Sequence, residues 1–371
     1  MPGDNPTLVK RVRDSGSRWN ALRKVDTLAM FDFGTSIVTL DSLHLPEVAG
    51  VKLTDLSSAY QLDFQTFERQ SKALSLAVHE YTHFVDSTST VWGLRHLKVL
   101  DKAYSCSMAD ESGFYVMRQC YNHLKRLKLP DYYTAVPEIH AATRPWRWAL
   151  SAGREFKHDG KPGDRPILFS RFSNADGELL ARSPISVISL LETNAMAEEI
   201  EVSAVLNSRL GDERVVQERV YERKILGHLY NENLTEYSVC AHMVANHFGM
   251  TDARIAFWAS SVISRLALNS ARTVYDRMGQ NLKPFFAEMG LRSSDPQVKL
   301  IYKSLADYNP GAIFYVICMY MPQGALSYRE FFLLALKQVM TDLGIDEEFF
   351  KAEALSEASD YVGVLRRSSY N

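Results

Sequence analysis

The segment at residues 63–86, DFQTFERQSKALSLAVHEYTHFVD, constrains the fold of this 371-residue chain more than any other. It holds no proline or glycine, and it therefore predicts one long helix. Apolar residues stand on both sides of its HEYTH motif (residues 79–83) and make the helix apolar almost all round, which predicts burial on several sides. Histidine and glutamate are costly to bury alone, and a bound cation is the simplest partner for them.

The motif has the spacing of a metal site. On a helix, residues four apart lie about 40° apart on one face, so His79 and His83 can point their imidazoles at one ion. Glu80, one residue further round, can reach a water on that ion rather than the ion itself. Two histidines with a carboxylate and an open position favour Zn²⁺, so we expect zinc, with Glu80 as the general base.

The third ligand is expected to be a carboxylate from another helix. In SVISLLETNAMAEEIEVS (residues 186–203), Glu192 and Glu199 lie seven apart, about 20° from coincidence, within an apolar stripe. Glu198 and Glu201 point away from that stripe and are expected to be solvated. We predict Glu192 as the ligand, with Glu199 as a supporting carboxylate outside the ligand set or as the alternative ligand. The competing interpretation is a salt bridge from Glu192 to a core arginine or lysine.

Two further acidic residues are candidates near the motif. Glu111, in MADESGF, is the rival third ligand, because its distance from His83 resembles that in several compact metallopeptidases. Asp86, three residues beyond His83, could hold an imidazole N–H or could cap the helix end. A metzincin would need glycine at position 86 and histidine at position 89, where this chain has Asp86 and Ser89, so that class is excluded.

The chain resembles the gluzincin branch of the zincin metallopeptidases in two motifs, HEYTH at residues 79–83 and LLETNAMAEE at residues 190–199. The strands expected before the motif helix also agree with the layout of that family. The resemblance implies a zinc-dependent peptidase fold, with the active site between the motif helix and a helical lower half, and a peptide or protein substrate. The chain departs from the family in the long gap before Glu192 and in Met196, which stands where the family has aspartate. Tyr237 is a candidate donor to the oxyanion, or else a tyrosine packed on the core.

The rest of the sequence predicts a mainly α fold with a small β element. Residues 27–45 indicate one or two strands around a glycine turn, and residues 165–185 indicate a β-hairpin within a Pro/Gly-rich insertion at about 129–184. Further helices are expected over about 90–126, 184–209, 214–230, 236–248, 251–275, 297–307, 312–320, 327–343 and 346–366. The predicted domains are a polar basic arm (1–25), a zincin-like core (26–210) and a helical subdomain (211–371).

Composition limits the other function classes. The net charge is −2, so the whole chain lacks the basic footprint of a nucleic-acid-binding protein, and only the arm at residues 1–25 favours that class. Its four cysteines form no CxxC pair and favour reduced thiols in the cytoplasm. The N-terminus has no apolar core, and the apolar run GAIFYVICMYM is about half of a bilayer crossing, so we expect neither a secretory signal nor a membrane span.

A non-catalytic zincin-fold module, kept for binding or regulation, is the alternative to an enzyme. The intact Glu80 argues against it, because a purely structural metal site needs no base there. The other histidines are expected to stay outside the site: His242 and His247 do not share a helix face, and His96, His123 and His228 are interpreted as lone residues. The sequence specifies neither the substrate nor the oligomeric state.

Overall fold

The computed structural model describes residues 29–40, 43, 51, 56, 60–107, 109–127, 129–134, 144–157, 159–326 and 329–368. Helices dominate the structure and two small antiparallel sheets complete it, which confirms the mainly α class with a small β element. The predicted basic arm at residues 1–25 lies outside the described residues. No helix among those described has the length and apolar character that a membrane crossing requires.

The motif helix follows a small hairpin. Strands β1 (Met30–Asp32) and β2 (Ile37–Thr39) pair antiparallel around a tight turn, as the sequence predicts. Helix α3 (Phe64–Ser89) then confirms the predicted long helix. Its N-cap is Asp63, whose carboxylate accepts a hydrogen bond from the backbone N–H of Thr66 at 2.9 Å.

Two predicted helices are each a pair of helices. The segment predicted over residues 90–126 divides into α4 (Val91–Tyr104) and α5 (Glu111–Leu127). The segment predicted over 251–275 divides into α9 (Ala253–Leu268) and α10 (Arg272–Asn281). Neither break contains proline or glycine, so the sequence lacked the strongest signals for ending a helix.

The Pro/Gly-rich insertion holds a three-stranded sheet rather than a hairpin alone. Strands β4 (Pro162–Ser173) and β5 (Leu179–Pro184) form the predicted hairpin, and β3 (Arg147–Phe156) pairs with the other edge of β4. The strand β3 was missed because its charged residues and glycine are not typical of a strand. Trp146, just before β3, is buried and stacks on the ring of His242 with centroids 5.3 Å apart, so it anchors the start of the sheet on α8.

The other helices lie in the second half of the chain. They are α6 (Val187–Ser208), α7 (Arg214–Leu229), α8 (Thr235–Phe248), α11 (Lys283–Glu288), α12 (Pro296–Ala306), α13 (Pro310–Tyr320), α14 (Arg329–Asp342) and α15 (Glu347–Ser368). Short 3₁₀ turns are η3 (Asp131–Tyr133), η4 (Glu232–Leu234) and η5 (Gln323–Leu326). Ser186 begins α6 with a capping box to Ser189, two residues after the predicted Pro184.

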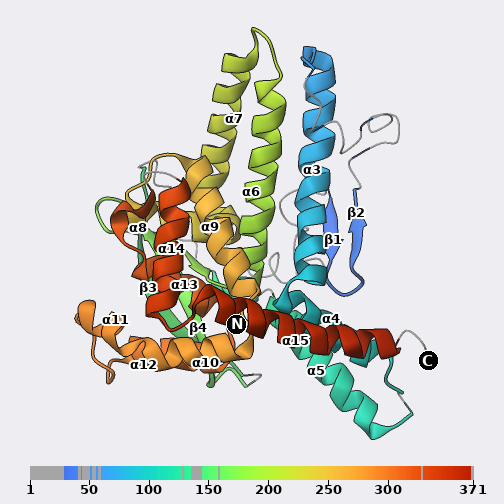
Figure 1. Ribbon diagram of the computed structural model, residues 1–371, viewed down its shortest axis with the longest axis vertical. Coiled ribbons are helices and arrows are strands. Elements are labelled where there is room, and N and C mark those ends of the chain that lie inside the picture. Colours follow the sequence, from blue (N-terminus) through green and yellow to red (C-terminus); the bar gives the residue numbers. More distant parts are fainter. Residues whose placement is uncertain are drawn as a thin grey trace, which may run out of the picture.

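The long helices α3 and α6 pack side by side, and α7 runs back along α6 (Figure 1). Between α3 and α6, the outer part of the contact is apolar and includes Leu74, Val202 and Leu206. The main core lies at the other end, where α6 meets α8, α9 and the three-stranded sheet. This arrangement fixes the part of α3 that holds the motif against the part of α6 that holds the predicted carboxylates.

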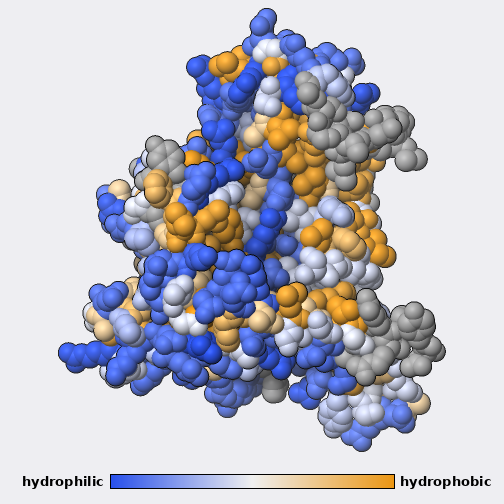
Figure 2. Space-filling model, viewed as in Figure 1, coloured by the Kyte–Doolittle hydropathy of each residue, from blue (hydrophilic) through white to orange (hydrophobic). Residues whose placement is uncertain are grey.

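The surface around α3 carries more apolar side chains than the helix tips above it. Figure 2 shows hydrophobic residues along α3 and the neighbouring β1–β2 hairpin, and mostly hydrophilic residues over the ends of α6 and α7. Ile37, Tyr81, Phe84 and Val85 are among the exposed large side chains. The rings of Tyr81 and Phe84 stack with centroids 6.0 Å apart.

Two buried histidines, His96 and His242, and the partly buried His123 are expected to make the fold sensitive to acid. The Nε2 atom of His242 lies 2.6 Å from the carbonyl oxygen of Leu229, and burial lowers the pKa of His242 to about 4. Burial also lowers the pKa values of His96 and His123 to about 4. The unfolded chain therefore takes up protons below about pH 6.5, whereas the folded chain does so only near pH 4.

The free energy of unfolding should consequently fall as the pH decreases from about 6.5 towards 4, and this stability should be fully present above pH 6.5. His242 alone is expected to contribute about 3 kcal/mol to that change, at about 1.4 kcal/mol for each pKa unit. Urea unfolding of the wild type and of His242→Gln between pH 7 and pH 4.5 measures this contribution as the difference between their slopes. Equal slopes would show that His242 does not carry the effect.

Candidate metal centre

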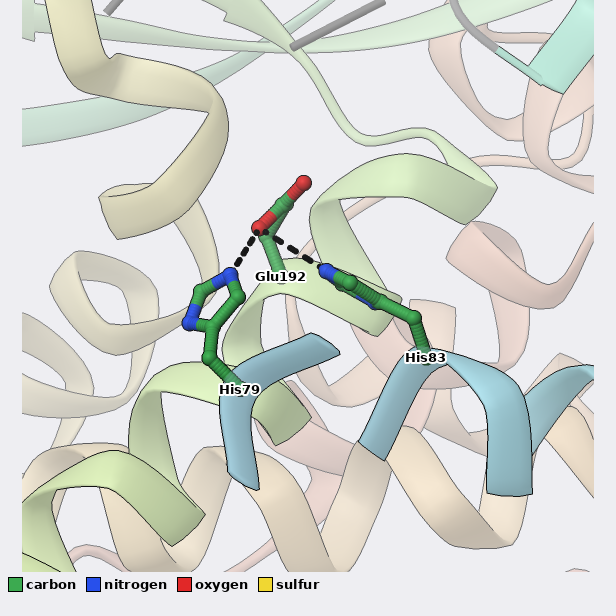
Figure 3. Close-up of side chains that lie close together, drawn as sticks. All are labelled: His79, His83 and Glu192. Carbon is green, nitrogen blue, oxygen red and sulfur yellow. Dashed lines mark ion pairs between the residues drawn. The ribbon is translucent and has the colours of Figure 1, made fainter. Parts of the chain in front are cut away.

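The middle of α3 faces the start of α6 through three buried side chains. His79 and His83 come from successive turns of α3 and Glu192 from the second turn of α6, with exposures of 9%, 0% and 0%. The Oε2 atom of Glu192 lies 3.3 Å from Nε2 of His79 and 3.5 Å from Nε2 of His83 (Figure 3). The structure thus brings together the two histidines of the motif and the carboxylate that the sequence singled out.

The separations of the Glu192 oxygen from the two histidine nitrogens fit a tetrahedral ion. One nitrogen or oxygen from each residue lies within 4.8 Å of the others. Ligands about 2.0–2.1 Å from zinc at tetrahedral angles are about 3.3–3.4 Å apart, close to the two separations above. Both ring nitrogens of His83 and both carboxylate oxygens of Glu192 are buried without a hydrogen-bond partner. Such atoms are costly to leave unpaired, and a cation between them satisfies three residues together.

Electrostatics also require a positive charge beside Glu192. Burial opposes ionisation of Glu192, but the neighbouring His83 and His79 outweigh it and lower the pKa of Glu192 to about 2. Burial likewise disfavours the charged form of His79, yet Glu192 and Glu199 raise the pKa of His79 to about 10. Among the described residues, the ion pairs of Glu192 are with the two histidines and not with arginine or lysine. The charge is therefore balanced by a proton or by a metal, and a metal would displace the proton.

Glu80 stands next to this cluster without joining it. Its side chain is 4% exposed, and its Oε2 atom is buried without a hydrogen-bond partner. Burial raises the pKa of Glu80, while the charges of His79 and His83 and a hydrogen bond from the backbone of Phe31 act in the opposite direction. A carboxyl whose pKa is raised towards neutrality is suited to accept and release a proton near neutral pH.

Glu199 lies behind His79, on the side away from Glu192. Its Oε2 atom is 3.5 Å from Nδ1 of His79, and its Oε1 atom is 3.5 Å from Nζ of Lys224 on α7. An acceptor at Nδ1 fixes the ring tautomer that leaves Nε2 free to coordinate. The sequence offered Glu199 either this supporting place or that of the ligand, and the geometry corresponds to the supporting place.

Asp86 does not occupy either place considered for it. It is buried and accepts a 2.7 Å hydrogen bond from Nδ2 of Asn194, while Nδ1 of His83 has no hydrogen-bond partner. Helix α3 continues past Asp86 to Ser89, so Asp86 does not cap it either. Ser261 of α9 donates to Oδ1 of Asn194 at 2.9 Å, and Asp86 thereby links α3, α6 and α9. The sequence interpretation considered only places for Asp86 within its own helix, whereas its hydrogen-bond partner Asn194 lies on α6.

The other carboxylates lie outside the cluster. Glu111 begins α5, is exposed and accepts from the hydroxyl of Tyr115 at 3.1 Å, so it is not the third member. Glu198 and Glu201 are solvent-exposed, as expected, and pair with Arg265 at 2.6 Å and Arg329 at 3.9 Å.

Tyr237, near the start of α8, lies beside the cluster. Its ring centroid is 6.5 Å from that of His79. Burial, with the negative charges of Glu192, Glu236 and Glu80, raises the pKa of Tyr237 well above 10. The hydroxyl therefore stays protonated at neutral pH and keeps a hydrogen to donate, although the oxyanion role remains a prediction.

Sequence reasoning missed one histidine pair. Nδ1 of His96 on α4 lies 2.9 Å from Nε2 of His123 on α5, and Nε2 of His96 lies 2.8 Å from the carbonyl oxygen of Phe33. These residues were interpreted as lone histidines, and that interpretation was wrong. No local spacing could have found the pair, because the contact depends on how α4 packs on α5.

Comparison with known proteins adds no relative. No family model, no curated protein and no solved structure matches this chain.

Removing the charge of Glu199 is expected to weaken metal binding while leaving the ligands in place. We expect Glu199→Gln to lower zinc affinity by about 10- to 100-fold, because the glutamine holds Nδ1 of His79 less strongly. Glu198→Gln is the matched control, since Glu198 is the preceding residue and pairs with Arg265 instead. Competition with a zinc chelator measures both variants. If Glu199→Gln bound zinc as tightly as Glu198→Gln, Glu199 would have no supporting role.

Proposed function

We propose that this chain is a zinc-dependent metallopeptidase in which His79, His83 and Glu192 hold the ion and Glu80 is the general base. The observation that supports the proposal most is the buried donor set: Glu192 Oε2 lies 3.3 and 3.5 Å from the two histidine nitrogens, and among the described residues its ion pairs involve neither arginine nor lysine. The resemblance to gluzincins in the motif and in the glutamate helix points the same way. Zinc bound there would supply a Lewis acid for the peptide carbonyl and make water a nucleophile at neutral pH.

The residues of the chain then have separate tasks. Glu80 takes the proton from the attacking water and passes it to the leaving amine, which its partly raised pKa favours. Glu199 orients His79 from behind, with Lys224 beside it. Tyr237 offers a hydroxyl that can donate to the oxyanion formed from the peptide carbonyl.

A cleavage assay with metal added and removed tests the proposal. Purified protein saturated with zinc is expected to cleave a mixture of unstructured peptides of diverse sequence, with new N-termini identified by mass spectrometry. A chelator should stop cleavage and added zinc should restore it, because the ligands lose their ion and regain it. Zinc-saturated protein that cleaves none of these peptides would contradict a general peptidase activity.

A non-catalytic zincin-fold module is the second candidate, and the burial of the site favours it. Glu80 is 4% exposed and His83 and Glu192 are both 0% exposed, as in a metal site that serves stability. In that case zinc should raise the midpoint of thermal unfolding without any cleavage. The two candidates therefore differ in the assay above and agree on metal binding.

A further inference from the structure

The β1–β2 hairpin lies directly over the proposed base and one proposed ligand. The ring centroids of Phe31 and Phe33 are 6.4 and 6.0 Å from that of His83. The backbone of Phe31 also hydrogen-bonds Glu80. Figure 1 shows the hairpin alongside the lower half of α3, on the side away from α6. The hairpin thus closes the side of the centre on which Glu80 lies.

This position has a consequence for any substrate. A general base must come within about 2.6–3.2 Å of the proton that it accepts, directly or through one water. The Oε2 atom of Glu80 is buried, and strand β1 packs against α3, the helix that carries Glu80. Phe31 and Phe33 fill the space beside His83, and we expect a peptide bond that lies against both the ion and Glu80 to need that space. The hairpin must therefore move before the proposed reaction begins.

The hairpin is built as a separable unit. Its strands have three residues each, and within the described residues they pair only with each other. Two-stranded hairpins of this size are marginally stable alone, so contacts with the body must hold it. Phe31 and Phe33 are buried and contribute apolar contacts between the hairpin and the body. Two hydrogen bonds at the turn end add to these contacts.

These two bonds act as latches. Nε2 of His96 lies 2.8 Å from the carbonyl oxygen of Phe33, and the hydroxyl of Tyr104 donates to the carbonyl oxygen of Gly34 at 2.8 Å. His96 is neutral at pH 7 and has one N–H, so it donates from Nε2 and accepts at Nδ1 from His123, 2.9 Å away. Both latches belong to α4, which follows the motif helix directly.

We propose that the β1–β2 hairpin is a lid over the metal centre, which His96 and Tyr104 latch closed and which must lift before a peptide can reach Glu80. The inference rests on the proposed function, because it assigns a regulation to the same site. In the closed state the ion and the base are shielded from solvent. In the open state the apolar surface left by Phe31 and Phe33 becomes free for the substrate.

Tyr104→Phe tests the lid with little risk to the fold. Tyr104 is 72% exposed, and the substitution removes only the hydroxyl that bonds Gly34. Losing one such hydrogen bond should make opening about three- to tenfold more frequent. Tyr115→Phe is the matched control, because the Tyr115 hydroxyl bonds Glu111 within α5 and does not contact the hairpin.

Two readouts separate the lid from the enzyme. Hydrogen exchange at residues 29–40, above all at the Phe31 amide, reports opening whether or not zinc is bound. The limiting rate at which excess chelator removes zinc reports access to the ion. Both rates should rise about three- to tenfold in Tyr104→Phe and stay unchanged in Tyr115→Phe.

The outcomes distinguish the two proposals. Unchanged exchange at residues 29–40 in Tyr104→Phe would overturn the lid, even if the protein were an active zinc peptidase. Faster exchange in a protein that binds zinc but cleaves no peptide would support the lid and overturn the peptidase.

Discussion

Glu80→Gln is expected to retain zinc and the fold but to lower the rate of peptide hydrolysis by at least about a hundredfold. General acid–base catalysis typically contributes about 10²- to 10⁴-fold, and a glutamine amide cannot accept the proton from the attacking water. The substitution keeps the size of the side chain, which matters because Glu80 is almost fully buried. It also removes a carboxyl whose burial raises its pKa, so the variant should be at least as stable as the wild type.

The zinc content of Glu80→Gln decides between base and ligand. Elemental analysis of the purified variant should give the same stoichiometry as the wild type, and cleavage of peptides should be measured on that same preparation. A variant that lost its zinc would show that Glu80 coordinates the ion. A variant that kept both zinc and full activity would place the base elsewhere.

The second large effect is expected from His83→Ala. Structural zinc sites with four protein ligands bind with about 10–16 kcal/mol, or about 3 kcal/mol for each ligand, so losing one should cost about a hundredfold or more in affinity. His83 is completely buried, and Oε2 of Glu192 would then retain only His79 within 3.5 Å. The variant should be purified without stoichiometric zinc and should be inactive, and His79→Ala should behave in the same way.

His247→Ala is the control for a lost, partly buried imidazole. Its Nε2 lies 2.8 Å from the carbonyl oxygen of Met321, outside the cluster. It should lose some stability and keep its zinc. Circular dichroism distinguishes loss of the fold from loss of the ion in every variant. If His83→Ala kept one zinc per chain with wild-type affinity, the ligand assignment would be wrong.

The sequence predicted the parts of the site that depend on periodicity. Four-residue spacing placed His79 and His83 on one face of α3, and the seven-residue spacing of Glu192 and Glu199 placed both on the face of α6 that meets it. Expected burial then distinguished the carboxylates of α6 as candidate ligands, because Glu192 interrupts an apolar stripe whereas Glu198 does not. These are local properties of a helix, and local properties can be read along the chain.

What the sequence did not predict depends on packing between distant segments. Asp86 accepts a hydrogen bond from Asn194, more than a hundred residues away in the sequence, and no pattern near Asp86 predicts that partner. The His96–His123 contact and its bond to Phe33 need three elements in place at once. The position of the β1–β2 hairpin beside Glu80 was missed for the same reason. The sequence predicted the strands but not the face of α3 against which they pack.

The central claim is that one zinc ion lies between His79, His83 and Glu192. Crystals of the zinc-saturated protein, measured on both sides of the zinc absorption edge, test it most directly through the anomalous difference map. We expect one strong peak per chain, about 2.0–2.1 Å from Nε2 of both histidines and about 2.0–2.2 Å from an oxygen of Glu192. A peak coordinated by Glu111 or Glu199 instead of Glu192, or no peak at this cluster in saturated crystals, would contradict it.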